Sequence, residues 1–118
     1  MARKLLVTLG LLLLTHSAAA VRVIEQVERP VELTLAELNL PAAGGTTISF
    51  SACPTCSTST HRLLDTTVLK VNGQTVPLQE FIRLADEIGD KPNGAENAIA
   101  VVFLDLATER ITRIEVRE

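Results

Sequence analysis

The 118-residue sequence has no tryptophan and no tyrosine, and its only large aromatic side chains are Phe50, Phe81 and Phe103. Surfaces that bind sugars or stack on nucleic-acid bases usually depend on exposed aromatic rings, so this composition argues against both functions. The lysines and arginines are scattered and form no basic run. We therefore expect no nucleic-acid partner and no anionic membrane partner, because both require clustered positive charge.

Motifs of common enzymes are missing as well. The sequence contains no Gly-x-Ser-x-Gly motif and no glycine-rich loop of the kind that cradles phosphate. Asp86, Glu87 and Asp90 are close in sequence but lack the alternating spacing of a calcium loop, so we interpret them as a solvated helix face. We predict no catalytic residue and no cofactor, and the sequence favours a role other than catalysis.

The N-terminus is typical of an export signal. Arg3 and Lys4 form a short basic start, and the apolar run that follows over residues 5–14 is about half the length that a membrane-spanning helix needs. Ala18 and Ala20 occupy the two positions that a signal peptidase reads. We therefore predict a signal peptide over residues 1–20, with cleavage after Ala20.

The predicted mature chain, residues 21–118, is a single small domain. Removing Arg3 and Lys4 leaves nine basic and fourteen acidic side chains, a net charge of −5. No second hydrophobic segment is long enough to span a membrane. We expect a periplasmic or secreted protein whose partner is an unidentified protein or small molecule, with no membrane contact after signal cleavage.

Alternating apolar residues predict strands over residues 31–35, 46–52 and 111–116, and the apolar segment 99–106 predicts a central strand. Asn72-Gly73 lies between two further apolar stretches and predicts a hairpin with a type I′ turn, in which both turn residues need positive φ. Pro77 suits the first turn of a helix, and Gly89 suits its C-cap.

Five to seven short strands and one helix predict a mainly β fold with one short helix, of the α+β class. Tight turns favour antiparallel pairing, and hence a small antiparallel barrel or a curled sheet with the helix packed across it. The periodicity predicts a core of ten residues: Ile48, Phe50, Val68, Val71, Phe81, Ile82, Val101, Phe103, Ile111 and Ile114.

The chemistry of the chain centres on Cys53-Pro54-Thr55-Cys56, which holds its only two cysteines. A local disulfide is the favoured interpretation, because a β-turn brings its end residues close enough to bridge and exported proteins usually oxidise their cysteines. A thiol redox centre is the first alternative. The second is a copper or zinc site formed by Cys53, Cys56 and His61, with Asp65 or another molecule supplying a further ligand.

From Thr46 onward the pattern resembles small exported β-rich proteins of Gram-negative bacteria whose function is uncharacterised. The resemblance covers about 70 residues. It is carried by the strand that leads into Cys53–Cys56, the segment Thr67-Val68-Leu69-Lys70-Val71-Asn72-Gly73-Gln74-Thr75-Val76, and the closing hairpin around Phe103 and Ile114. It implies a small secreted β domain and transfers no activity and no catalytic residue.

The strand before the CxxC motif is also similar to the entry of thioredoxin-like oxidoreductases. Those folds place a long helix directly after the motif, whereas only eleven residues separate Cys56 from Val68 here. The first four, Ser-Thr-Ser-Thr, are poor helix formers. We therefore expect an exported binding or structural domain with a local disulfide, and keep the periplasmic thiol redox protein and the copper- or zinc-binding protein as alternatives.

Overall fold

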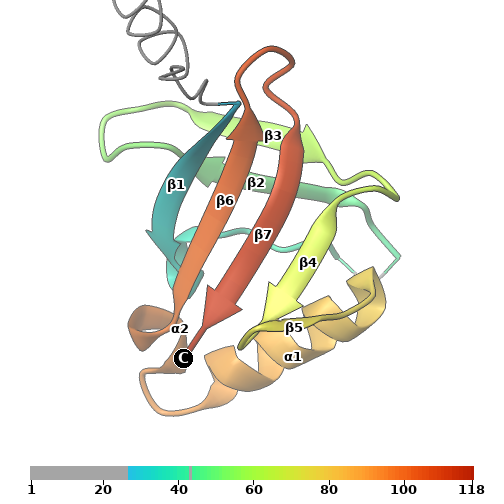
Figure 1. The fold of residues 1–118 in the computed structure, drawn as a ribbon. Helices are drawn as coiled ribbons and strands as arrows, with labels where there is room; N and C mark the ends of the chain where they lie inside the picture. The colour runs from blue at the N-terminus through green and yellow to red at the C-terminus, as the bar shows by residue number, and fades with distance from the viewer. Residues whose placement is uncertain (1–26, 43) are drawn as a thin grey trace, which may run out of the picture.

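The computed structural model describes residues 27–42 and 44–118, so the predicted signal peptide lies outside the described residues. Figure 1 shows the arrangement of the elements. In chain order they are β1 (Glu28–Thr34), a 3₁₀ turn (Leu35–Glu37), β2 (Thr47–Ser51), β3 (Thr58–Arg62), β4 (Val68–Val71), β5 (Gln74–Thr75), α1 (Leu78–Asp90), α2 (Gly94–Asn97), β6 (Ile99–Asp105) and β7 (Ile111–Arg117).

The fold is mainly β with one helix longer than two turns, as predicted, but its sheet does not close into a barrel. Five strands form one sheet in the order β1-β6-β7-β4-β5, and β2 and β3 form a separate hairpin. The expectation of antiparallel pairing throughout is wrong at one place, because β4 runs parallel to β7. The chain leaves β5 through α1 and α2 before it re-enters the sheet, so no tight turn joins β4 to β7.

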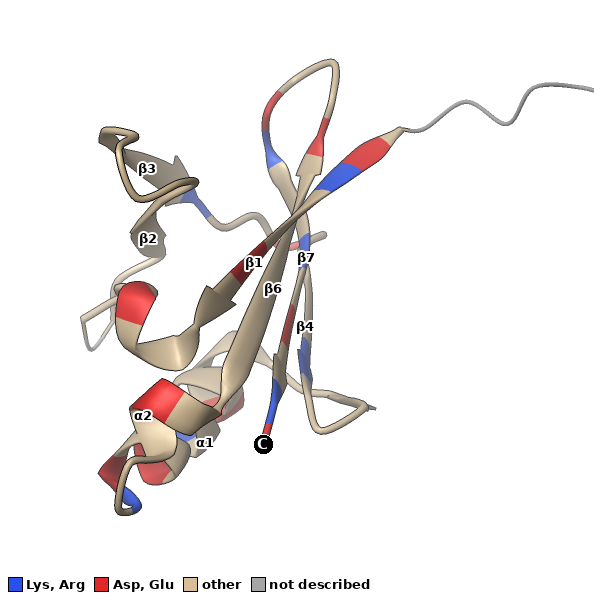
Figure 2. Cartoon of the chain, turned by 90° about the vertical axis from the view of Figure 1, so that its left-hand side faces the viewer, with Lys and Arg blue, Asp and Glu red and all other residues tan. Residues whose placement is uncertain are grey.

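Within residues 27–42 and 44–118, helices and strands cover only one face of the five-stranded sheet. In Figure 2 the sheet is seen nearly edge-on, and α1, α2 and the β2–β3 hairpin all lie on the same side of it. The side chains that point toward these elements are buried in every long strand, as Val31, Val102 and Ile114 illustrate. The opposite face carries no helix or strand in the described part of the chain.

The covered face holds the hydrophobic core, and six of the ten predicted core residues are buried in it. Phe81 and Ile114 are fully buried, with 0% exposure each. Three are predicted wrongly: Val68 is 38% exposed, and Val101 and Phe103 are half-buried on the open face. The remaining five are Ile48, Phe50, Val71 and Ile111, which are buried, and Ile82, which is half-buried.

The misassignment on β6 has a simple cause. Residues 99–104 are all apolar, so alternation within the strand does not distinguish its two faces. The structure turns Ala100, Val102 and Leu104 inward, and therefore places Ile99, Val101 and Phe103 on the open face.

The Asn72-Gly73 turn is confirmed. Both residues have positive φ, 50° and 85°, and they join β4 to β5 as a two-residue loop. The helix is confirmed over Leu78–Asp90, with Pro77 as its N-cap. Gly89 is not the C-cap, because the helix continues through it and Lys91 takes that position.

No helix in residues 27–42 and 44–118 is both long and apolar enough to cross a bilayer.

Candidate functional site

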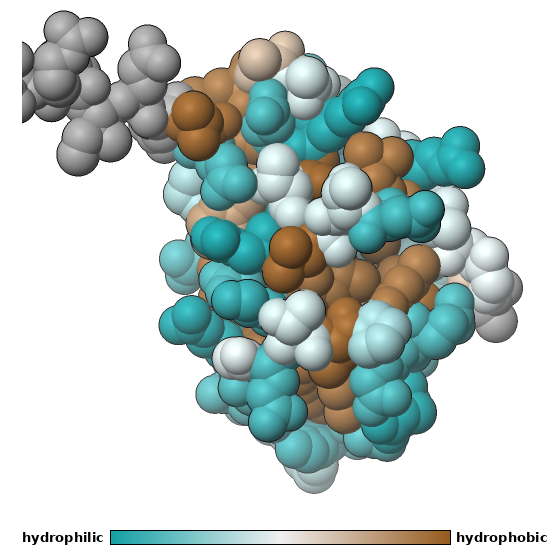
Figure 3. Space-filling view, turned by 45° about the vertical axis from the view of Figure 1, so that its right-hand side comes forward, coloured by the Kyte–Doolittle hydropathy of each residue, from teal (hydrophilic) through white to brown (hydrophobic). Residues whose placement is uncertain are grey.

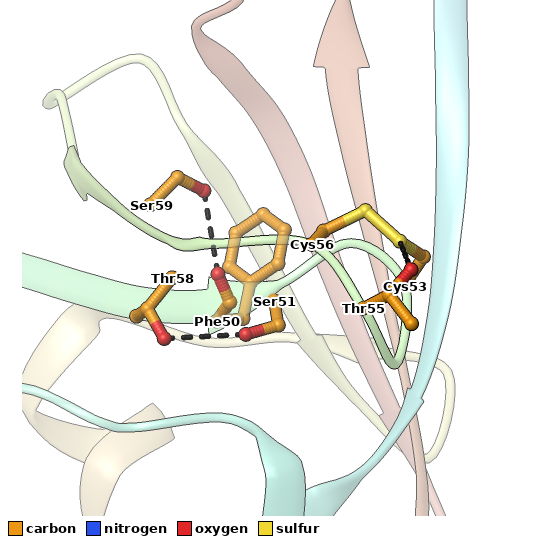
Figure 4. Close-up of a disulfide and its surroundings, with 7 residues drawn as sticks. All are labelled: Phe50, Ser51, Cys53, Thr55, Cys56, Thr58 and Ser59. Atoms are coloured by element: carbon orange, nitrogen blue, oxygen red, sulfur yellow. Dashed lines mark hydrogen bonds between the residues drawn. A yellow bond between two sulfur atoms is a disulfide. The ribbon is translucent and has the colours of Figure 1, made fainter.

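The two cysteines form a disulfide at the tip of the β2–β3 hairpin (Figure 4). Their Cα atoms lie 5.0 Å apart, and the Cys56 amide donates a hydrogen bond to the Cys53 carbonyl over 3.0 Å. This bond closes a four-residue turn around Pro54 and Thr55, the geometry that the sequence predicted for a local bridge. The disulfide therefore ties the end of β2 to the start of β3.

The surroundings of the disulfide favour a structural role. Cys53 is half-buried and Cys56 is exposed. A cavity of about 350 Å³ lies beside Cys53, and Glu37 is the only charged residue among those that line it. Reactive cysteines usually lie beside a positive charge or at the N-terminus of a helix, whereas the lining of this cavity includes no lysine and no arginine.

Hydroxyl side chains support the same hairpin. The hydroxyls of Ser51 and Thr58 lie 3.2 Å apart across the strand pair, and Ser59 donates to the carbonyl of Phe50 over 3.3 Å (Figure 4). Phe50 is buried, so the hairpin contributes an anchor to the core on its inner side. The polar segment after Cys56 is thus a strand, Thr58–Arg62, that the sequence did not predict.

His61 lies away from the cysteine pair. It pairs with Ile48 in the hairpin register. It lies three positions along β3 from Thr58, the first residue of the strand after the cysteine turn, so roughly 10 Å of strand separates His61 from Thr58. Its ring stacks on Phe50 with a centroid distance of 5.2 Å. The described residues contain no group of three or more histidine, cysteine, aspartate or glutamate side chains that could hold a metal ion. The structure therefore does not assemble the Cys53, Cys56 and His61 ligand set.

His61 instead contacts a serine. The Ser59 hydroxyl lies 2.9 Å from Nε2 of His61, because residues two apart on a strand share a face. Nucleophilic catalysis by such a pair needs a third group that orients the imidazole. No carboxylate in the described part of the chain hydrogen bonds to His61, and the Ser59 hydroxyl also reaches the Phe50 carbonyl. This pair therefore lacks the arrangement of a hydrolytic site.

A cavity of about 680 Å³ opens beside His61, between β3 and the turn that joins β6 to β7. Arg62 and Arg110 belong to its lining, together with Glu109. Neither arginine forms an ion pair with a described residue, whereas Arg83 and Arg117 do. Three other lining residues, Ser59, Thr60 and Thr108, carry hydroxyls, and Leu64 is aliphatic.

The β6–β7 turn that carries Arg110 is tightly organised. The Asp105 carboxylate accepts hydrogen bonds from the backbone amides of Ala107 and Thr108 over 2.8 and 2.9 Å. These two bonds hold the pKa of Asp105 below its ordinary value, because they stabilise the ionised form. Glu109 then adopts a left-handed conformation, with φ of 59°, which turns the chain toward Arg110 and β7.

A second, more apolar groove lies on another side of the molecule. It measures about 610 Å³ and runs between residues 63–69 and residues 75–78, with Asp65 as its only charged lining residue. Figure 3 brings the β4 and β5 side forward and shows apolar surface between hydrophilic side chains there. Asp65, which the sequence offered as a possible metal ligand, lines this groove and not the cysteine turn.

Arg62 and Arg110 were not predicted as site residues. They are 48 positions apart in the chain, and each is flanked by ordinary residues, so no local pattern distinguishes them. The fold brings them to one cavity because β3 and the β6–β7 turn lie at the same end of the molecule (Figure 1).

Comparison of this chain with protein-family models, with curated proteins and with solved structures finds no match.

Proposed function

We propose that this chain is an exported binding domain that holds an anionic group of its ligand in the cavity formed by β3 and the β6–β7 turn. The observation that carries the proposal is the pair of arginines, Arg62 and Arg110, which line one cavity without acidic partners among the described residues. Guanidinium groups bind carboxylate and phosphate oxygens in a bidentate manner. Hydroxyls of Ser59, Thr60 and Thr108 add further donors.

In this proposal the disulfide has a supporting role. It fixes the tip of the hairpin whose other end carries His61 and Arg62, so the cavity wall keeps its shape when the ligand is absent. Preorganised side chains lose less conformational entropy on binding, which raises affinity without any new contact. Export to an oxidising compartment fits this role, because disulfides persist there.

The test is a titration followed by ¹H–¹⁵N NMR, with inorganic phosphate and succinate as separate probes at constant ionic strength. We expect saturable shifts in the amides of residues 59–64 and 108–110, and their loss in Arg62→Gln/Arg110→Gln. Arg29→Gln is the matched control, because Arg29 is exposed on β1 and does not line this cavity. Shifts that stay linear, or that Arg29→Gln abolishes equally, would contradict the proposal.

A thiol-exchange function is the second candidate, favoured by one observation. Cys56 is exposed at the hairpin tip, where the thiolate of another protein can approach the disulfide. Its reduction potential separates this candidate from a structural bridge, and the corresponding prediction is given below.

A further inference from the structure

We propose that the open face of the five-stranded sheet is the contact surface between two copies of this chain, packed face to face. The face is defined by the outward residues of four strands: Pro30, Glu32 and Thr34 of β1, Ile99, Val101 and Phe103 of β6, Arg113, Glu115 and Arg117 of β7, and Val68 and Lys70 of β4.

Four of these residues are apolar side chains on β6 and β4. Ile99 and Val68 are 43% and 38% exposed, and Val101 and Phe103 are half-buried. Phe103 is half-buried beneath the guanidinium of Arg113, which lies 4.0 Å from the ring centroid. Arginine and aromatic side chains are enriched in protein interfaces.

The charges on the face are arranged in register. Glu32, Val101, Glu115 and Lys70 are successive cross-strand neighbours, so they form one row across the sheet. Glu115, inside the row, pairs with Arg117 of its own strand over 3.9 Å. Glu32 is at the β1 end and Lys70 at the β4 end, separated by three strand spacings of about 4.8 Å each. At roughly 14 Å they are too far apart to pair within one chain.

A second copy brings these charges together. If a two-fold axis runs parallel to the strands between β6 and β7, then β1 of one copy lies over β4 of the other. Glu32 then faces Lys70 of the second copy, and Lys70 faces its Glu32, so one row forms the same ion pair twice. The next row places Pro30 over Val68, which matches apolar with apolar, and sets the stacked Phe103–Arg113 pair of one copy against that of the other.

The usual angle between packed sheets preserves this match. The strands of aligned packed sheets cross at about 30°, a rotation about the normal to the sheets. Glu32 and Lys70 each lie about 7 Å from the line midway between β6 and β7, so this rotation displaces them by only about 4 Å. Glutamate and lysine side chains are long enough to span that displacement. Charge complementarity thus favours a second copy of this chain over an unrelated partner as the occupant.

The experiment is sedimentation equilibrium of the purified protein and of two charge reversals. We expect a concentration-dependent dimer, and Glu32→Lys and Lys70→Glu should each raise its dissociation constant at least about tenfold, because each creates two like-charge contacts. Mixing the two variants in equal amounts should restore association to the parental level, since the lysine introduced in one variant then faces the glutamate introduced in the other. Glu96→Lys, an exposed reversal on α2, is the matched control and should leave the dimer unchanged.

Three results would overturn the inference. The parent protein could remain monomeric at the highest concentration reached, which would leave the face to a different partner. The dimer could be indifferent to both reversals, which would place the contact elsewhere, for example at the β1 edge. The mixture could fail to associate although each variant is folded by circular dichroism, which would contradict the pairing of β1 with β4.

Discussion

A β-carbon built on Gly94 would fall 1.8 Å from the carbonyl oxygen of Ile88. The chain reverses there between α1 and α2, and Asn93 takes a left-handed conformation with φ of 56° to make the reversal possible. Ile88 is buried in the core, so its backbone has little freedom to move aside. The close approach therefore requires glycine at residue 94.

We predict that Gly94→Ala lowers the free energy of unfolding by about 1–3 kcal/mol, the usual range for overpacking at a rigid contact. Urea unfolding monitored by circular dichroism measures this change. Gly89→Ala is the matched control: its new methyl group would meet only Ala95, at 4.0 Å, and alanine is the better helix former. It should raise the same free energy by up to about 1 kcal/mol. Equal effects at the two positions would contradict the assigned backbone contact.

The cysteine pair gives a second prediction. Cys53→Ser/Cys56→Ser should fold and lose about 2 kcal/mol of stability or less, because the closed loop contains only four residues and constrains the unfolded chain weakly. In this variant the amide resonances of residues 59–64 and 108–110 should still shift on titration with phosphate, but with weaker affinity. Complete loss of the folded state would mean that the hairpin depends on the bridge far more than chain entropy allows.

The same bridge distinguishes the structural role from thiol exchange. A structural disulfide should have a reduction potential below about −300 mV and resist a glutathione buffer, whereas an oxidoreductase has a higher potential. We expect resistance. An equilibrium titration that gives a potential near those of known oxidoreductases would replace the binding domain with the thiol-redox candidate.

The third prediction is export. It rests on the sequence, because residues 1–26 lie outside the described structure. The basic start, the short apolar run and Ala18-x-Ala20 predict processing by a signal peptidase. The intact mass of protein purified from its native host should correspond to a chain that begins at Val21 and lacks the two hydrogens of a reduced cysteine pair. Retention of Met1 in the mature protein would contradict this prediction.

Local signals in the sequence predicted the local structure well. Asn72-Gly73 determines its turn because few other residues tolerate positive φ, and α1 is determined by the spacing of Phe81, Ala85 and Ile88. The turn at Cys53–Cys56 is similarly local, because its two ends are only three residues apart.

Features that depend on distant parts of the chain were not predictable in the same way. β3 is a polar strand that pairs with β2, and its residues lack the apolar alternation that would have predicted a strand. The parallel pairing of β4 with β7 depends on how α1 and α2 return the chain to the sheet. The cavity with Arg62 and Arg110 is formed by two segments that share no motif, so it can be identified only from the folded chain.

Two phenylalanines test the assignment of the core. Phe81 is fully buried, so Phe81→Ala should cost about 3–5 kcal/mol. Phe103 is half-buried on the open face, so Phe103→Ala should cost roughly 1–2 kcal/mol, part of it from the lost stack with Arg113. Unfolding should be measured at low protein concentration, where association through the open face contributes little. Equal losses would return Phe103 to the core and reverse the orientation of β6.

The last prediction concerns acid stability and the turn that presents Arg110. The amides of Thr108 and Ala107 lower the pKa of Asp105 in the folded state relative to its ordinary value of 3.8. A carboxyl group whose folded-state pKa is lowered stabilises the protein fully above its unfolded pKa and loses that contribution as the pH falls through the folded value. Asp105→Asn should therefore be less stable than the parent at neutral pH, and the difference should shrink below about pH 4. Urea unfolding of both proteins across this range measures the difference, and a gap that stays constant with pH would show that the Asp105 charge does not stabilise the turn.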